Sequence, residues 1–346
     1  MSTSRATWRR RSRSSSALAL LGLALLGSGG ARAGADRPVA LAFDRTHGYE
    51  TDVWIAGPDG SDARSLVRNA FGPRLSPDGR RLAYVVPRRP DALPILWVRT
   101  FASGRTTRID AAIDVSWGPQ SRRLVYSTRQ RILLADIESG NRRLLARGHV
   151  CCANFAPDGR AVVFARSNGS FGRHFRSDVY AIRLSDGHVS RLTHDRQSDR
   201  AVWGRGWIAY SHTRARGGWL IRDLRLMRPD GSGKRLLAGG HTRPSHAEMG
   251  VEPVAFSRDG TRLLACLASE FECSPVAFAI PDGLRYTLRV GRRNELTVGM
   301  AISRDGTQVL VEAGRLEGPF RALAVPLAKG RPRVLARNAE RASWSR

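Results

Sequence analysis

A short hairpin signal that recurs along nearly the whole chain restricts its fold more than any other feature. An apolar or aromatic residue is followed by a turn and then by an apolar strand, as in Leu75-Ser76-Pro77-Asp78-Gly79 before residues 82–85. Further copies begin at Trp117, Phe155, Trp203, Phe256, Ile302 and Trp344. Asp-Gly between apolar runs favours a tight hairpin, because glycine accepts a positive φ without steric cost. The sequence therefore predicts a repeated unit built on β-hairpins.

A second hairpin signal lies between these copies. Here an apolar strand ends in a glycine turn and a short strand follows, as at residues 53–55 and 65–67. The turn glycines are Gly60, Gly104, Gly140, Gly187, Gly231, Gly283 and Gly330. Two hairpins in series give four antiparallel strands, and a four-stranded repeat of about 40–50 residues is typical of a β-propeller blade.

The two ends of the chain complete one of these units. Residues 39–43 match the second strand of a blade that lacks its inner strand, and residues 342–345 match an inner strand that lacks the rest. Pairing of the two ends would hide two sheet edges. We therefore predict an all-β fold, namely a seven-bladed β-propeller of four-stranded antiparallel blades, closed by pairing of the N- and C-terminal segments in one blade. An open sandwich or a solenoid of the same repeats is the alternative.

The N-terminus has the pattern of an export signal. An arginine-rich start is followed by an apolar run over residues 17–27 and by the small-residue site Ala31-Arg32-Ala33. This order is typical of a secretory signal peptide, and the run is shorter than the roughly 20 residues that cross a bilayer. We expect a signal peptide over residues 1–33 and a single β-propeller domain over residues 34–346. The exported protein would lie in the periplasm, the cell envelope or outside the cell, with no transmembrane segment after cleavage; an uncleaved anchor is the alternative.

The composition is globular and strongly basic. Hydrophobic residues make up 42% of the chain, which is enough for a core, and 57 Lys and Arg against 30 Asp and Glu give a formal charge of +27. A basic surface favours an anionic partner, such as an anionic polymer. No basic helix, RNA-binding signature or zinc finger is present, so we expect no nucleic-acid partner.

The Ser-Pro-Asp-Gly copy at residues 76–79 and the related Asp-Gly turns resemble the TolB-like, WD40-like (PD40) propeller repeats of bacteria. The resemblance covers nearly all of the chain after the signal. It implies a rigid scaffold that binds proteins or peptides, although the family also includes propellers attached to enzymes. TolB itself departs from this chain, because it has six blades and an additional N-terminal α/β domain.

One face of such a propeller carries the loops between blades together with the loops between second and third strands. In this chain those loops hold most of the histidines and the irregular insertions, so we predict that this loop-rich face binds the ligand. The candidate ligand-binding residues are His149, Arg173, His174, His194, His241, His246 and Glu248. A metal or acid–base site formed by the histidines and Glu248 is one hypothesis. Solvated polar loops, or a peptide contact assisted by histidine, are the alternatives.

Signatures of catalysis are missing from the sequence. The repeated aspartates Asp78, Asp158, Asp259 and Asp305 are interpreted as turn formers rather than acids, because each precedes a turn glycine. No Gly-x-Ser-x-Gly elbow, calcium-binding loop or phosphate-binding glycine loop occurs. We therefore predict no catalytic residue, no metal and no cofactor.

The four cysteines fall into two pairs. Cys266 and Cys273 flank a short hairpin connection with six residues between them, so a disulfide is predicted for an exported chain. Cys151 and Cys152 begin an inner strand, where adjacent side chains point to opposite sides, so a bond between them would need a strained turn. Two reduced or separately paired thiols are expected there, and a redox or metal role is left open.

These features together predict an exported, non-enzymatic scaffold. It would bind a protein, a peptide or an anionic polymer through the loop-rich face. The alternative is a stand-alone propeller enzyme, a lyase or hydrolase, with a polar or metal site at the mouth of the central channel. Convergence of three or more of the named histidine and glutamate side chains would favour the enzyme.

Overall fold

The computed structural model describes most of the chain after residue 38. The described residues are 39–89, 91–169, 176–216, 219–240, 248–269, 273–286, 288, 290, 292, 295–315 and 318–345. They form 28 strands and no helix. The predicted signal peptide lies outside the described residues. No helix in the described part of the chain has the length and apolar character needed to span a bilayer.

Consecutive strands pair antiparallel in groups of four, and three of these groups are separate sheets. The first is β4 (Phe71–Leu75), β5 (Arg81–Val86), β6 (Ile95–Thr100) and β7 (Thr106–Ala111). The second is β8 (Asp114–Trp117), β9 (Arg123–Ser127), β10 (Arg131–Asp136) and β11 (Arg142–Arg147). The third is β12 (Val150–Phe155), β13 (Ala161–Ser167), β14 (Ser177–Arg183) and β15 (Val189–Arg191).

A twelve-stranded sheet contains the next three groups. They are β16 (Ser198–Gly204), β17 (Trp207–Arg216), β18 (Trp219–Met227) and β19 (Arg235–Ala238), then β20 (Glu248–Phe256), β21 (Arg262–Ser269), β22 (Cys273–Ala279) and β23 (Arg285–Tyr286), then β24 (Leu296–Ile302), β25 (Gln308–Gly314), β26 (Arg321–Pro326) and β27 (Arg333–Arg337). Pairing inside each group is antiparallel. Single parallel pairs, Arg222 with Gly250 and Cys273 with Val298, join one group to the next.

The remaining sheet combines both ends of the described chain. Its strand order is β28 (Glu340–Trp344), β1 (Leu41–His47), β2 (Glu50–Ala56) and β3 (Arg64–Val67). Leu41 pairs with Trp344, and the Ser345 hydroxyl donates to the Val39 carbonyl oxygen at 2.6 Å. The C-terminal strand therefore takes the place of the inner strand that the N-terminal group lacks.

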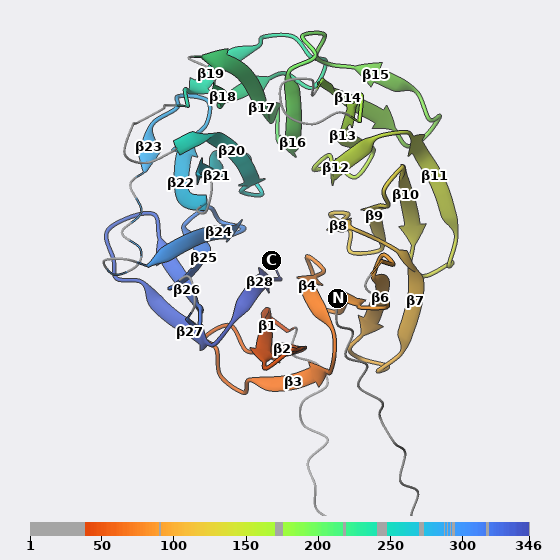
Figure 1. Cartoon of the computed structure of the whole chain (residues 1–346), viewed down its shortest axis with the longest axis vertical. Coiled ribbons are helices and arrows are strands. Elements are labelled where there is room, and N and C mark those ends of the chain that lie inside the picture. The colour runs from red at the N-terminus through yellow and green to blue at the C-terminus, as the bar shows by residue number, and fades with distance from the viewer. Residues whose placement is uncertain are drawn as a thin grey trace, which may run out of the picture. The chain divides into compact units, whose positions relative to one another are not determined.

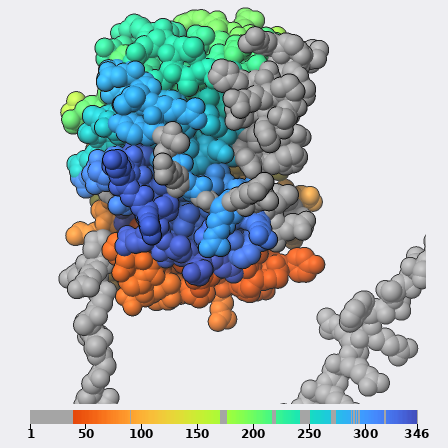
Figure 2. Space-filling model, turned by 90° about the vertical axis from the view of Figure 1, so that its left-hand side faces the viewer, coloured from red at the N-terminus to blue at the C-terminus, as the bar shows by residue number. Residues whose placement is uncertain are grey.

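The first strand of each group lies nearest the centre and the fourth lies outermost. Figure 1 shows β4, β8, β12, β16, β20, β24 and β28 around one centre. In the side view of Figure 2, the groups β20–β23 and β24–β27 follow one another toward the N-terminal strands. The predicted all-β fold of four-stranded antiparallel sheets is confirmed.

Hydrogen bonds link several neighbouring inner strands. Trp117 Nε1 of β8 donates to the Arg74 carbonyl oxygen of β4 at 2.8 Å, and the Leu75 N–H donates to the Ser343 hydroxyl of β28 at 3.0 Å. Asn154 of β12 donates through Nδ2 to the Ala201 carbonyl oxygen of β16 at 3.2 Å. These bonds hold adjacent sheets in register around the centre.

The core lies between adjacent sheets, because every sheet packs on both faces. Middle strands are therefore apolar without alternation: Val162, Val163 and Phe164 of β13 are all fully buried. One core cluster packs Val163 of β13 against Ile208 of β17 in the next sheet. Face-to-face packing of twisted sheets gives this arrangement.

The aspartates of the repeat form turns, as predicted. An Oδ1 atom of Asp78, Asp158, Asp259 and Asp305 accepts a hydrogen bond from the N–H two residues later, at 2.9–3.0 Å. The following glycine has a positive φ, which is 67° at Gly79. These carboxylates are thus used by their own turns.

Candidate functional site

The inner strands enclose a central cavity of about 490 Å³. Every four-stranded group contributes to its wall. One lining residue from each inner strand is, in chain order, Arg74, Asp114, Cys152, Arg200, Pro253, Met300 and Trp344. The cavity is therefore a site that all the repeats build together.

A bulge interrupts the inner strands where they enter this cavity. The pairing register shifts between Phe71 and Arg74 in β4, and the strands β12, β16 and β28 contain similar irregularities. Residues with positive φ mark these positions: Gly72 (65°), Cys152 (61°), Arg200 (46°) and Arg341 (49°). A bulge re-aims a side chain, and a non-glycine residue in this conformation is uncommon. The hairpin pattern of the sequence gave no sign of Arg200 or Arg341, whereas Cys152 was noted as one of a vicinal cysteine pair.

Arg200 is exposed, lines the cavity and belongs to a charge cluster. Its Nη1 lies 2.7 Å from Glu252 Oε2, and Arg222 Nη1 lies 2.8 Å from the other oxygen, Glu252 Oε1. Burial raises the pKa of the neighbouring Asp199, while Arg222 and Arg200 act in the opposite direction. Two guanidinium groups therefore face two carboxylates, those of Glu252 and Asp199, so the cluster has no net charge when both acids are ionised.

The vicinal cysteines differ from the expected alternation along the strand. The positive φ at Cys152 and the register shift between Cys151 and Asn154 bring the two thiols together instead of placing them on opposite sides. The hydrogen bond between the thiols lowers the pKa of Cys151 and raises the pKa of Cys152. Both cysteines are free, and Cys151 is exposed. The pair is therefore a dithiol in which Cys151 is exposed and Cys152 lines the cavity.

Only part of the predicted ligand-binding set lies in the described residues. His149 and His194 are exposed in the loops before β12 and β16. The His149 ring lies against Gly169, where an added Cβ would be 2.5 Å from Nε2. Arg173, His174, His241 and His246 lie outside the described residues, and Glu248 is described only by its backbone pairing with Ser269. Within the described ranges no three histidine, cysteine or acidic residues are grouped to hold a metal ion.

A further polar cluster includes a histidine that sequence analysis did not select. Asp195 Oδ2 lies 3.3 Å from His212 Nδ1, and the Ser198 hydroxyl donates to Asp195 Oδ1 at 2.9 Å. Burial opposes ionisation of Asp195, but its bonds with His212, Gln197 and Ser198 hold its pKa at about 2. Ser198 is fully buried and contacts the same ring nitrogen as Asp195, at 3.4 Å. In a catalytic triad the serine and the acid contact different nitrogens of the histidine ring, whereas here both contact Nδ1. The cluster therefore stabilises the loop before β16.

The second cysteine pair lies at the end of a hairpin. A disulfide joins Cys266 of β21 to Cys273 of β22, with 5.0 Å between their Cα atoms. Cys273 faces Ala268 in the strand pairing, so the bond closes the connection between the two strands.

Comparison with known proteins gives the fold but no close relative. No protein-family profile matches the chain, and no curated protein matches it in sequence. The β-propeller domain of the Trilobed protease from Pyrococcus furiosus is similar in structure, with 16% identity and a TM-score of 0.62. The alignment covers 86% of this chain and 95% of the protease domain's chain. Oligogalacturonate lyase from Vibrio parahaemolyticus is similar at 10% identity and a TM-score of 0.55, over 87% and 85% of the two chains. TolB from Acinetobacter baumannii is similar at 15% identity and a TM-score of 0.48, over 89% and 83%.

At these identities the likeness concerns the fold alone. The chain has a β-propeller fold, as its repeats predicted, while membership of the TolB-like repeat family stays a prediction. The similar structures include the propeller domain of a protease and a lyase, so the fold does not choose between binding and catalysis.

Proposed function

We propose that this protein is an exported, non-enzymatic scaffold that binds a protein or peptide, or a segment of an anionic polymer, through its loop-rich face. Residues 1–33 would be removed on export. Residues 34–346 would form a closed seven-bladed propeller, with the sheet of β28 and β1–β3 as the blade that joins both ends. The observation that carries the proposal is the central cavity, because inner strands of all seven four-stranded groups line it.

The walls of this cavity support rigid presentation of a binding surface. Neighbouring inner strands are tied by the hydrogen bonds of Trp117, Asn154 and Leu75 described above. Loops on a rigid frame bind without a large loss of conformational entropy. Under this proposal the exposed His149 and His194 would contact the ligand together with the other predicted loop residues, Arg173, His174, His241, His246 and Glu248.

Charge favours an acidic segment as the part of the partner that is bound. The attraction comes from the surface as a whole, because Arg200 and Arg222 are balanced locally by Glu252 and Asp199. The chain as a whole carries a formal charge of +27. A positive surface steers an anionic partner toward itself and raises the association rate.

A pulldown with crosslinking from the native cell envelope tests this proposal. The matched variant replaces residues 241–247 by a Gly-Ser linker of equal length. It keeps Gly240, whose N–H donates to buried Asp223 at 2.9 Å, and Gly250, which pairs with Arg222, so the fold is retained. We expect one defined partner with the native protein and at least about tenfold less with the variant, a difference of about 1.4 kcal/mol. Equal capture by both proteins would refute binding through this face.

A propeller enzyme is the second candidate function, and Cys151 is the observation that favours it. Its exposed thiol has a lowered pKa and is hydrogen-bonded to Cys152, which lines the cavity. A thiolate is the form that acts as nucleophile or metal ligand. Metal analysis of the purified protein separates the two functions: a stoichiometric metal that disappears in Cys151→Ser supports the enzyme.

A further inference from the structure

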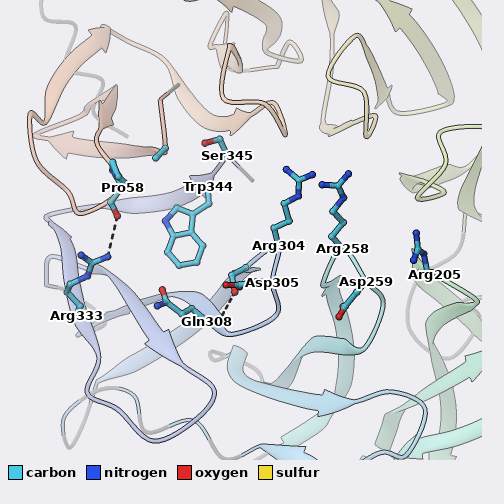
Figure 3. Close-up of a pocket in the computed structure, with 12 residues that line it drawn as sticks. Pro58, Arg205, Arg258, Asp259, Arg304, Asp305, Gln308, Arg333, Trp344 and Ser345 are labelled. Atoms are coloured by element: carbon cyan, nitrogen blue, oxygen red, sulfur yellow. Dashed lines mark hydrogen bonds between the residues drawn. The ribbon is translucent and has the colours of Figure 1, made fainter. Parts of the chain in front are cut away.

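A second cavity, of about 750 Å³, lies on the opposite face, where the hairpin turns follow the inner strands. We call it the turn-face cavity. Its wall contains Arg205, Arg258 and Arg304 from three successive groups and Trp344 from β28 (Figure 3). Trp344 is half-buried and also lines the central cavity, so it lies next to both sites.

The three arginines occupy one position of the repeat. The residue after the small turn residue is proline in three early copies and arginine in three later ones: Pro77, Pro119, Pro157, Arg205, Arg258 and Arg304. Proline is suited to this place because it fixes one backbone angle of the turn. Arginine brings no such benefit to the turn itself. The fold thus gathers three long cationic side chains on neighbouring turns.

Contacts between turns place the three arginines next to one another. A Cβ added at Gly260 would lie 2.9 Å from the backbone nitrogen of Arg205, so the turn that carries Arg258 packs on Arg205. The Arg258 N–H donates to the Arg304 carbonyl oxygen at 3.3 Å. In Figure 3 the side chains of Arg258 and Arg304 lie side by side and point in the same direction. One rim of the cavity is therefore a row of like charges.

The three arginines are not held in ion pairs within the described part of the chain. Among the residues that the structure describes, no ion pair involves Arg205, Arg258 or Arg304, and all three are exposed. The two carboxylates of the lining, Asp259 and Asp305, accept hydrogen bonds from Thr261 and Thr307 in their own turns. With Arg333, the lining holds four guanidinium groups against these two carboxylates, so it keeps a net positive charge.

We propose that the turn-face cavity binds a short polyanion, a ligand with two or more oxyanion groups in series, through Arg205, Arg258 and Arg304. A guanidinium group offers paired N–H donors that match a carboxylate or a phosphate. A repeating row of donors fits repeating acceptors, whereas one monovalent anion neutralises one arginine and leaves its neighbours repelling each other. Trp344 supplies a flat wall, and Gln308 and Ser345 add neutral polar groups beside it.

Isothermal titration calorimetry of the full chain tests the site with three defined probes: inorganic tripolyphosphate, a trimeric uronate and orthophosphate. The test variant changes Arg205, Arg258 and Arg304 to Gln. The matched control makes the same change at Arg68, Arg129 and Arg331, which are exposed arginines that do not line the cavity. Both variants lose the same charge, and unchanged circular dichroism verifies their folding.

We expect at least one trimer to bind about tenfold more tightly than orthophosphate, which corresponds to about 1.4 kcal/mol. The test variant should lose that binding by about tenfold or more, the control should keep it within about twofold, and the affinity should fall as salt rises. Preference between the trimers identifies phosphate or carboxylate as the recognised group. Binding of neither trimer, or an equal loss in the control, would overturn the proposal and leave the function proposed for the loop-rich face unaffected.

Discussion

The contact between Glu312 and the C-terminal strand gives a prediction about pH and stability. Glu312 lies in β25, is 6% exposed, and its Oε1 accepts a hydrogen bond from the Ala342 N–H of β28 at 2.5 Å. Burial raises the pKa of Glu312 from 4.5 to about 7, and the nearby carboxylates of Glu340 and Asp44 act in the same direction. Glu312→Gln keeps an acceptor oxygen for Ala342 and removes the charge.

The magnitude follows from the shift in pKa. Between pH 4.5 and about pH 7 the folded protein holds a proton on Glu312 that the unfolded chain has released. The stabilisation from this group is therefore complete at low pH and is lost as pH rises through the pKa of the folded state. A shift of roughly two pKa units or slightly more corresponds to about 3 kcal/mol. At about pH 8 the variant should be more stable than the native protein by an amount approaching this value, and at about pH 4.5 the two should be equal.

Urea unfolding followed by tryptophan fluorescence at several pH values measures this difference. Glu138→Gln is the matched control, because the Glu138 side chain is 53% exposed. We expect the stability difference between Glu312→Gln and the native protein to grow with pH, while the control difference stays flat. Parallel pH profiles for the native protein and Glu312→Gln would refute the buried-charge argument, and a variant less stable at every pH would show that the carboxylate itself is needed at the β25–β28 contact.

Three further predictions concern the closing strand and the cysteines. Arg341→Ala removes the guanidinium that lies 2.6 Å from Asp44, which is fully buried and whose pKa is raised to about 6 by burial. The free energy of unfolding measured in urea should fall by about 2–4 kcal/mol at high pH and by less in acid, where Asp44 is protonated. Thiol titration of the unfolded chain should find two free thiols before reduction and four after it, whereas four throughout would contradict the Cys266–Cys273 disulfide. Alkylation of Cys151 by iodoacetamide should begin below its ordinary pKa of 9.0, and a normal onset would contradict the thiol contact.

The repeating parts of the fold were predictable because their causes are local. A turn such as Ser76–Gly79 is encoded by residues that bond within the turn, and the same pattern in each copy multiplied the evidence. The pairing of Leu41 with Trp344 also followed, since each end lacked what the other supplied. The disulfide between Cys266 and Cys273 was expected from their spacing in a hairpin.

The bulged inner strands were not predictable in the same way. Cys152 and Arg200 have positive φ although neither residue favours it, because the register with the neighbouring strand imposes the conformation. The prediction that adjacent side chains of β12 point to opposite sides was therefore wrong at the cysteine pair. His212 was missed for a related reason: its partner Asp195 is distant in sequence and comes close only through strand pairing.

The amino-acid sequence by itself determined the hairpins, their fourfold grouping and the meeting of the chain ends, because turn chemistry and apolar periodicity act over a few residues. Only the tertiary structure decided which side chains share a cavity. The prolines and arginines of the repeat turns look equivalent along the chain, yet packing of successive turns sets Arg258 beside Arg304 and both near Trp344. Such proximity depends on long-range packing of whole sheets, and no local pattern encodes it.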